Sequence, residues 1–154
     1  METRVIQNNL FFQEIASRIA EGERVRMRAK GNSMLPFIRD SKDEVVLEKP
    51  NKRSFQKGRL LLVQLSDKRY VLHRVEKIEN NAVLLRGDGN LSILETCSVA
   101  DVIAEVTTVI RNGKEIKRGS FKWNMYRYLW PRNPFIRRVA LGVYRRVSRL
   151  AFSD

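Results

Sequence analysis

The stretch of sequence that decides the fold is RLLLVQLSDKRYVLHRVEKIENNAVLLRGDGN, residues 59–90. It holds three short apolar runs, 60–65, 70–78 and 82–85, and turn-forming residues separate them at 66–67 and 80–81. Runs of this length, rich in Val, Ile and Leu and separated by such turns, are typical of strands joined by short hairpins. The stretch therefore predicts an antiparallel sheet in the middle of the chain.

The flanking sequence extends this pattern on both sides. Further strands are expected at 25–29, 44–47 and 102–110, and Asn112-Gly113 predicts a tight hairpin turn to a short strand at 114–117. Many short strands at close spacing predict a mainly β fold with a partly closed, antiparallel, barrel-like core. Residues 5–20 carry apolar side chains at helical spacing and predict a helix that stops at Gly22.

Length and composition predict one domain with three parts. A chain of 154 residues is the usual size of a single domain, divided here into an N-terminal helix (1–22), a β domain (23–118) and a C-terminal segment (119–154). One Cys and one His exclude an internal disulfide and an ordinary four-ligand zinc site, and no metal or cofactor is expected. No apolar run is long enough to span a membrane and no signal peptide is recognised, so we expect a cytoplasmic location.

The positive charge is concentrated in the C-terminal segment. Of the formal net charge of +13, residues 111–154 contribute +10, from 12 Lys and Arg against two acidic residues. Residues 135–152 predict an amphipathic helix with an apolar stripe: Ile136, Val139, Val143, Val147 and Leu150. We prefer the interpretation in which this stripe packs on the β core and the arginines face water.

Two other roles for the C-terminal segment stay open. The first is peripheral attachment to an anionic membrane, at its inner face, through residues 119–154. The residues expected to contact the membrane or another anionic partner are Trp123, Trp130, Arg137, Arg138, Arg145, Arg146 and Arg149. The second role is nucleic-acid binding, which we favour less.

Three short stretches in the β region carry residues suited to nucleophilic catalysis. Ser33 follows a predicted strand, His73 lies within one, and Asp88 sits between two glycines just past another. A serine nucleophile needs a base to take its proton, and a carboxylate that orients this base stabilises its charged form. The alternative interpretation of each residue is ordinary: a loop serine, a buried strand histidine and a turn. Cys97 is a further thiol, which we expect to be structural and buried.

The three stretches resemble the signature boxes of the type I signal peptidase and LexA-like serine peptidase clan. Ser33-Met34-x-Pro36 is similar to its nucleophile box, while His73-Arg74-Val75 and Gly87-Asp88 resemble the archaeal and endoplasmic-reticulum branch. The resemblance implies the clan's partly closed β core, with Ser33 as nucleophile, His73 as base and Asp88 as third member. It also implies a peptide or protein substrate, extended and leader-like, bound by addition to a sheet edge.

The sequence departs from the family pattern at several positions. Bacterial leader peptidases have a Ser where this chain has Gly31, so the resemblance implies an oxyanion hole built from backbone N–H groups, with Gly31, Asn32, Met34 and Pro36 supporting the turn. A second acidic residue expected beyond the Gly-Asp pair has Glu95 as its nearest match, which leaves the third member open between Asp88 and Glu95. Asp43 is the nearest match to an acidic residue expected after the nucleophile box.

Signal peptidases also carry membrane anchors, and LexA-type proteins carry a DNA-binding domain; neither is recognised in this sequence. Two alternatives to a peptidase therefore stay open. One is a catalytically inactive module that binds a peptide or partner on the same scaffold. The other is a basic regulator associated with nucleic acid. The substrate, the role of the basic segment and the oligomeric state stay undetermined by the sequence.

Overall fold

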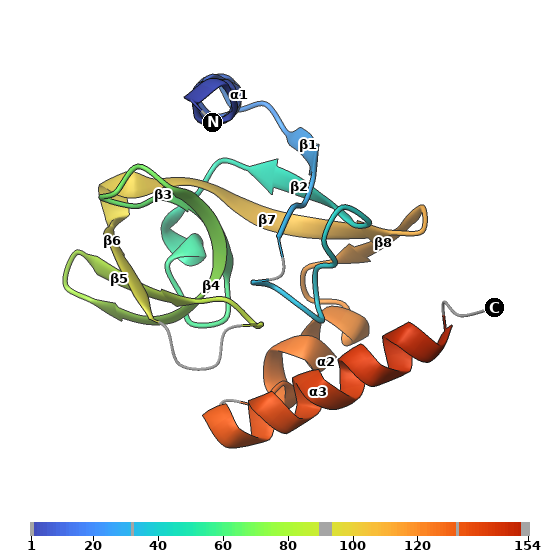
Figure 1. The fold of residues 1–154 in the computed structure, drawn as a ribbon. Helices are drawn as coiled ribbons and strands as arrows, with labels where there is room; N and C mark the ends of the chain where they lie inside the picture. Colours follow the sequence, from blue (N-terminus) through green and yellow to red (C-terminus); the bar gives the residue numbers. More distant parts are fainter. Residues whose placement is uncertain (1, 32, 90–93, 132, 152–154) are drawn as a thin grey trace.

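One curled antiparallel sheet forms the body of the protein, in a computed structural model that describes residues 2–31, 33–89, 94–131 and 133–151 (Figure 1). The strands are β1 (Val25–Arg28), β2 (Glu44–Glu48), β3 (Leu60–Gln64), β4 (Tyr70–Glu79), β5 (Ala82–Arg86), β6 (Glu95–Ser98), β7 (Val102–Arg111) and β8 (Lys114–Lys117). The helices are α1 (Glu2–Ala20), α2 (Phe121–Leu129) and α3 (Pro134–Ala151), with short 3-10 turns η1 (Lys52–Ser54) and η2 (Val99–Asp101).

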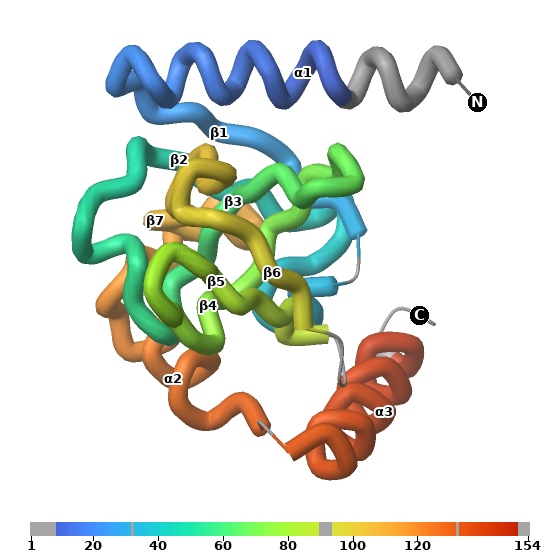
Figure 2. Tube along the Cα trace, turned by 90° about the vertical axis from the view of Figure 1, so that its left-hand side faces the viewer, coloured from blue at the N-terminus to red at the C-terminus, as the bar shows by residue number. Residues whose placement is uncertain are grey.

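The strand order of the sheet is β1-β2-β7-β3-β4-β5-β6, and β8 forms a hairpin with β7. The pairing registers shift at Val46/Leu47, Leu62/Val63 and Val75/Lys77. Such bulges bend a strand and increase its twist, which suits the strong curl of the sheet toward a half-barrel (Figures 1 and 2). The mainly β fold with a helix at each end, expected from the sequence, is confirmed.

Both faces of the central strand β3 are buried, which explains its continuous apolar run. Leu60 and Leu62 join a core with residues of β1, β2, β7 and α1, whereas Leu61 and Val63 join a second cluster with β4 and β5. Alternate residues of a strand point to opposite faces, so one strand serves two cores. The same alternation in β4 separates Leu72 from Val71 and Val75.

The N-terminal helix packs on the sheet as its apolar spacing predicted. Ile15 and Ile19 are buried in the larger core, and Phe12 packs against that core. Gly22 follows the helix with a φ of +87°, a left-handed conformation that Gly adopts without the steric cost of a side chain. The helix therefore stops where the sequence indicated.

The structure adds two elements that the sequence pattern did not predict. The four-residue strand β6 pairs with β5, and it is too short to show a clear alternation. Helix α2 occupies the aromatic and basic stretch before the prolines, and its N-cap is Ser120, whose side chain accepts from the N–H of Trp123. A Ser directly before a helix is the signal that would have found α2.

The packing of α3 corrects the interpretation we preferred for the C-terminal segment. The stripe of Ile136, Val139, Val143, Val147 and Leu150 is exposed and does not pack on the β core. The side of α3 that does pack carries Leu141 and Arg137, which are 3% and 4% exposed. The periodicity was right, but an amphipathic pattern does not state which face meets the protein.

Candidate active site

Ser33 lies in the connection between β1 and β2, and backbone hydrogen bonds join the two ends of this segment. The N–H of Ala29 donates to the carbonyl of Asp43, and the N–H of Ser41 donates to the carbonyl of Ala29. At Gly31 the φ of +96° favours a residue without a side chain, and its N–H donates to Asp40 at 2.8 Å. Residues 29–43 are called the nucleophile loop below. Asn32, expected to support this turn, lies outside the described residues.

A buried ion-pair network anchors the nucleophile loop to β7. Asp43 is fully buried and accepts hydrogen bonds from Arg39 and from Arg111 of β7. Burial raises the pKa of Asp43, but the hydrogen bonds from both guanidinium groups outweigh this and hold the pKa below its ordinary value. Arg111 also donates to the carbonyls of Pro36 and Phe37. This carboxylate, which the sequence marked only as an approximate family match, is therefore the anchor of the loop.

The Ser33 and Asp88 stretches lie side by side. The N–H of Gly89 donates to the carbonyl of Ser33 at 2.7 Å, and the N–H of Asp88 contacts the sulfur of Met34 at 3.4 Å. The structure thus brings together two segments that are more than fifty residues apart in the sequence. Residues 87–89 are called the Gly-Asp turn below.

His73 lies in β4, paired with Leu61 of β3, and is only 3% exposed. Burial lowers the pKa of its imidazole, and the nearby carboxylates of Glu95 and then Asp88 oppose this effect. Its Nδ1 atom is buried without a hydrogen-bond partner. The ring is therefore neutral at physiological pH, which is the state that a general base needs.

The carboxylate of Asp88 is paired with Arg74 and not with His73. Arg74 Nε and a terminal guanidinium nitrogen donate to the two Asp88 oxygens at 2.8 and 2.7 Å, and both side chains are largely buried. No hydrogen bond joins Asp88 to His73 in the described part of the chain. The direct orientation of His73 by Asp88, as the resemblance implies, is therefore not the arrangement seen here.

Glu95 occupies the same sheet face as His73. Val75, Leu85 and Glu95 are paired across β4, β5 and β6, and His73 lies two residues from Val75. One carboxylate oxygen of Glu95, Oε2, is buried without a hydrogen-bond partner, although Arg69 approaches it at 3.8 Å. Glu95 is also the carboxylate that raises the pKa of His73 most. Glu95 Oε2 and His73 Nδ1, both buried without a hydrogen-bond partner, thus belong to side chains on the same face of the sheet.

A groove of about 750 Å³ opens beside Ser33. Its walls are β1 with the following residues, through Gly31, and the beginning of β4. Met34, Ile38 and Leu62 form apolar parts of the lining, and Phe11 and Phe12 of α1 extend it. Phe12 stacks on Tyr70 with ring centroids 4.4 Å apart. The groove is suited to an extended chain with apolar side chains.

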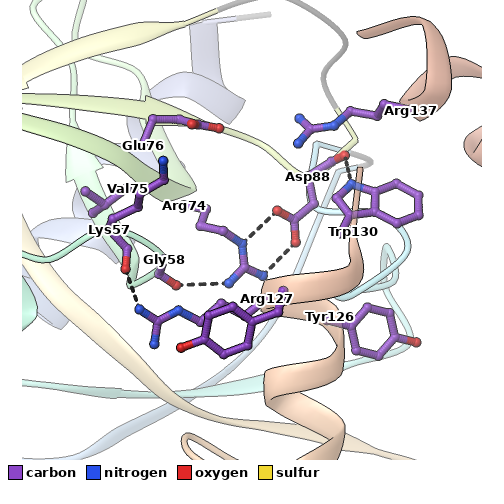
Figure 3. A pocket seen from close by; sticks show the side chains of 11 residues that line it. Lys57, Gly58, Arg74, Val75, Glu76, Asp88, Tyr126, Arg127, Trp130 and Arg137 are labelled. Atoms are coloured by element: carbon purple, nitrogen blue, oxygen red, sulfur yellow. Dashed lines mark hydrogen bonds and ion pairs between the residues drawn. The ribbon is translucent and has the colours of Figure 1, made fainter. Parts of the chain in front are cut away.

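The C-terminal segment packs against the Gly-Asp turn through Trp130 and Arg137. Figure 3 shows a small pocket of about 140 Å³ in which Arg74 lies between Asp88 and the carbonyl of Gly58. The Trp130 indole N–H donates to the carbonyl of Asp88 at 2.8 Å, and Arg137 points toward the turn, with 3.5 Å between its guanidinium and the carbonyl of Gly87. Burial lowers the pKa of Arg137.

These contacts correct part of the list of residues that we expected to contact a membrane or another anionic partner. Trp123 is buried against Phe37, with ring centroids 5.0 Å apart, and Arg137 is buried beside the Gly-Asp turn. Trp130 is half-buried and bonded to Asp88. Trp123 and Arg137 therefore face the protein interior, and Trp130 contributes a hydrogen bond to the Gly-Asp turn. Arg138, Arg145, Arg146 and Arg149 remain on the exposed part of α3.

The single cysteine is remote from nucleophilic chemistry. Cys97 is buried in the second cluster, and burial raises its pKa to about 11. A buried thiol with a raised pKa is a poor nucleophile. The side chain therefore contributes to packing.

Within the described ranges, no group of three or more His, Cys, Asp or Glu side chains is placed to hold a metal ion. None of the helices found in those ranges is long and apolar enough to cross a membrane. Comparison of the chain with family models, with curated proteins and with solved structures gives no significant match.

Proposed function

We propose that the protein is a serine peptidase that cleaves an extended peptide segment, with Ser33 as nucleophile and His73 as general base. The observation that carries the proposal is the hydrogen bond between Gly89 and the Ser33 carbonyl. It joins the nucleophile loop, whose Ser33 lines the groove, to the Gly-Asp turn, and Arg74 ties this turn to the strand that holds the buried His73. The resemblance to the signal peptidase and LexA-like clan supports the same assignment of residues.

The proposed reaction is an ordinary acyl transfer to serine. His73 takes the proton of the Ser33 hydroxyl while Oγ attacks the peptide carbonyl, and the oxyanion is stabilised by backbone N–H groups of the nucleophile loop. The protonated His73 gives its proton to the leaving amine as the C–N bond breaks. Water, deprotonated by His73, then hydrolyses the acyl-serine and restores both residues.

Glu95 is the better candidate for the carboxylate that stabilises protonated His73. It shares a sheet face with His73, raises the His73 pKa more than Asp88 does, and has a buried oxygen without a hydrogen-bond partner. Asp88 is neutralised by Arg74, so its role is to fix the Gly-Asp turn beside Ser33. Glu95 is one of the two residues that the sequence left open for the third member, whereas the role of Asp88 in fixing the turn was not expected from the sequence.

The substrate is proposed to bind as an added strand. Strand β1 ends the sheet and pairs only with β2 among the described strands, so its other edge faces the groove. A peptide in this position donates and accepts backbone hydrogen bonds while alternate side chains enter the apolar groove. Residues 26–31 would thus supply one wall of the substrate site, and Phe11 and Phe12 of α1 would supply its far end.

The test is cleavage of a library of unstructured peptides, with new termini identified by mass spectrometry. Wild-type protein is expected to produce cleavages that Ser33→Ala and His73→Gln both abolish, whereas Ser66→Ala, an exposed turn serine, leaves them unchanged. Equal cleavage by wild type and Ser33→Ala would overturn the assignment of the nucleophile.

The second candidate function is peptide binding without catalysis. One observation favours it: no hydrogen bond joins Ser33 to His73 in the described part of the chain, although such bonds are often long before substrate binds. Peptides that bind the groove and are never cut, with no loss of binding in Ser33→Ala, would replace the peptidase with this module.

A further inference from the structure

Helix α3 presents three different faces along its length. The packed face carries Arg137 and Leu141, and it meets the body of the protein. A second face is apolar and exposed; its members, each more than half exposed, are Phe135, Ile136, Val139, Val143, Val147 and Leu150. We call this face the exposed stripe. Figures 1 and 2 both show α3 at the periphery of the fold.

The third face of α3 is basic. At about 3.6 residues per turn, Arg138, Arg145 and Arg149 fall together along one edge of the exposed stripe, and Arg146 lies at the edge of the stripe itself. All four are exposed. No Asp or Glu occurs anywhere between residues 116 and 153. The charged side chains beside the exposed stripe are therefore all cationic.

We propose that α3 docks on the surface of an anionic lipid membrane, lying in the plane of the headgroups. The exposed stripe would enter the boundary between headgroups and acyl chains, and the arginines would contact lipid phosphates. Long cationic side chains at the edge of such a stripe can keep their charge at the headgroups while their methylene groups lie along apolar surface. Apolar burial and charge attraction thus act on one helix at the same time.

The charge pattern selects a membrane over the other occupants of an apolar face. A second copy of the chain would bring the same arginines close to one another, and residues 116–153 offer no carboxylate to pair with them. Nucleic acid would use the arginines but leave five exposed aliphatic side chains in water, because groups such as those of Val139 and Val143 do not stack on bases. An anionic lipid surface can bury the exposed stripe and contact the basic face at the same time.

Docking through α3 would also fix the orientation of the candidate active site. The opposite side of the helix is tied to the Gly-Asp turn through Arg137 and, just before the helix, through Trp130. The exposed stripe is thus held at a set position relative to Ser33. This proposal stands on the faces of α3 alone and does not depend on the peptidase activity.

The test is co-flotation of the full chain with lipid vesicles. Vesicles of phosphatidylcholine alone are compared with vesicles of phosphatidylcholine and phosphatidylglycerol in equal amounts, at low and at high salt. Wild-type protein is expected to float with the anionic vesicles at least about tenfold more than with the neutral ones, and salt should weaken this preference because it screens the arginines.

Two α3 variants, each with a control elsewhere in the chain, separate the contribution of the exposed stripe from that of the positive charge. Val139→Ser with Val143→Ser removes apolar side chains from the exposed stripe, and Leu10→Ser removes an exposed apolar side chain of α1 as its control. Arg138→Gln with Arg145→Gln lowers the positive charge by two, and Lys52→Gln with Arg53→Gln does the same at η1. The α3 variants are expected to lose flotation about tenfold, while the controls float like wild type. Circular dichroism and thermal unfolding verify that every variant is folded.

Four results would overturn the proposal. Equal flotation with both vesicle types, or no loss in the two α3 variants, removes the membrane as partner. A concentration-dependent dimer that Val139→Ser with Val143→Ser dissolves assigns the stripe to a second copy. Salt-sensitive binding to duplex DNA that needs the arginines but not the stripe assigns the face to nucleic acid. Ser33→Ala is expected to float like wild type, so failure of the peptidase proposal stays distinguishable.

Discussion

The guanidinium of Arg74 donates to both carboxylate oxygens of Asp88, at 2.8 and 2.7 Å, between β4 and the turn that follows β5. A third nitrogen of the same guanidinium donates to the carbonyl of Gly58. The Gly-Asp turn is in this way held against the strand that carries His73, while its own backbone holds Ser33. Arg74, which no catalytic argument singled out, thus connects the parts of the candidate site.

Replacement of Arg74 by Met is expected to destabilise the protein by about 3–5 kcal/mol. The variant leaves the Asp88 carboxylate buried without its paired cation, and loss of one partner of a buried ion pair costs that much. Chemical denaturation followed by circular dichroism measures the change. Arg69→Met is the control, because its pair with Asp67 is exposed to solvent and is expected to contribute little to stability. Equal effects of the two substitutions would contradict the structural role of Arg74.

The partner of Asp88 shows what a sequence can and cannot predict about such a site. The sequence predicted a strand at 70–78 and a turn that begins at Gly87; a strand is present at Tyr70–Glu79 and a turn at residues 88–89. His73 and Arg74 are consecutive in one strand, so they point to opposite faces, and the sequence does not state which face the turn meets. The structure puts Asp88 on the Arg74 face. The strand that carries Glu95 is too short to be recognised from its pattern.

The C-terminal segment shows the same limit for a helix. The periodicity of residues 136–150 predicted an amphipathic helix, and α3 is present. Apolar side chains usually face the protein interior, and that expectation failed because Arg137 and Leu141 provide the packed face. The guanidinium of Arg137 reaches backbone carbonyls of Pro131 and Gly87 that no sequence pattern reveals.

The pH dependence of peptidase activity is expected to follow His73. Burial lowers the pKa of this residue below its ordinary value of 6.5, so the neutral base persists, and kcat/KM holds, as the pH falls somewhat below 6.5. Glu95→Gln removes the carboxylate that raises this pKa most, so the acidic limb should move to still lower pH, and kcat should fall at least about tenfold because protonated His73 loses its stabilising charge.

The comparison variant for this prediction is Asp88→Asn. Its influence on the His73 pKa is smaller than that of Glu95, so its acidic limb should move less. A pH profile of kcat/KM for the wild type and both variants decides the matter. A larger shift of the acidic limb in Asp88→Asn than in Glu95→Gln would show that Asp88 is the carboxylate that stabilises protonated His73.

Cys97 is expected to resist alkylation in the folded protein. With a pKa of about 11, only about one thiol in a thousand is ionised at pH 8, and the side chain is buried. Iodoacetamide at pH 8, followed by mass spectrometry, should modify the native protein at least about tenfold more slowly than the unfolded protein. The variant Ser66→Cys adds an exposed thiol whose rapid labelling serves as the positive control. Fast labelling of native Cys97 would show that β6 opens readily.

Asp43 is expected to dominate the acid sensitivity of the nucleophile loop. Its folded pKa lies below the ordinary value of 3.8, because the hydrogen bonds from Arg39 and Arg111 outweigh the effect of burial. A carboxylate with a depressed folded pKa contributes stability that is fully present above its unfolded pKa and is lost as the pH falls through the folded pKa. The contribution should therefore be constant above about pH 5, should begin to decrease near pH 4, and should be lost only as the pH falls through the depressed folded pKa.

The substitution that tests this is Asp43→Asn. It leaves two buried guanidinium groups without their carboxylate, and the expected loss is about 3–5 kcal/mol near pH 7, measured by urea denaturation. The difference between wild type and variant should shrink as the pH is lowered, because protonation removes the same charge from the wild type. Glu115→Gln is the control, since its pair with Lys117 is exposed and contributes little at any pH. A difference that stays constant down to pH 3 would show that Asp43 acts through packing and not through its charge.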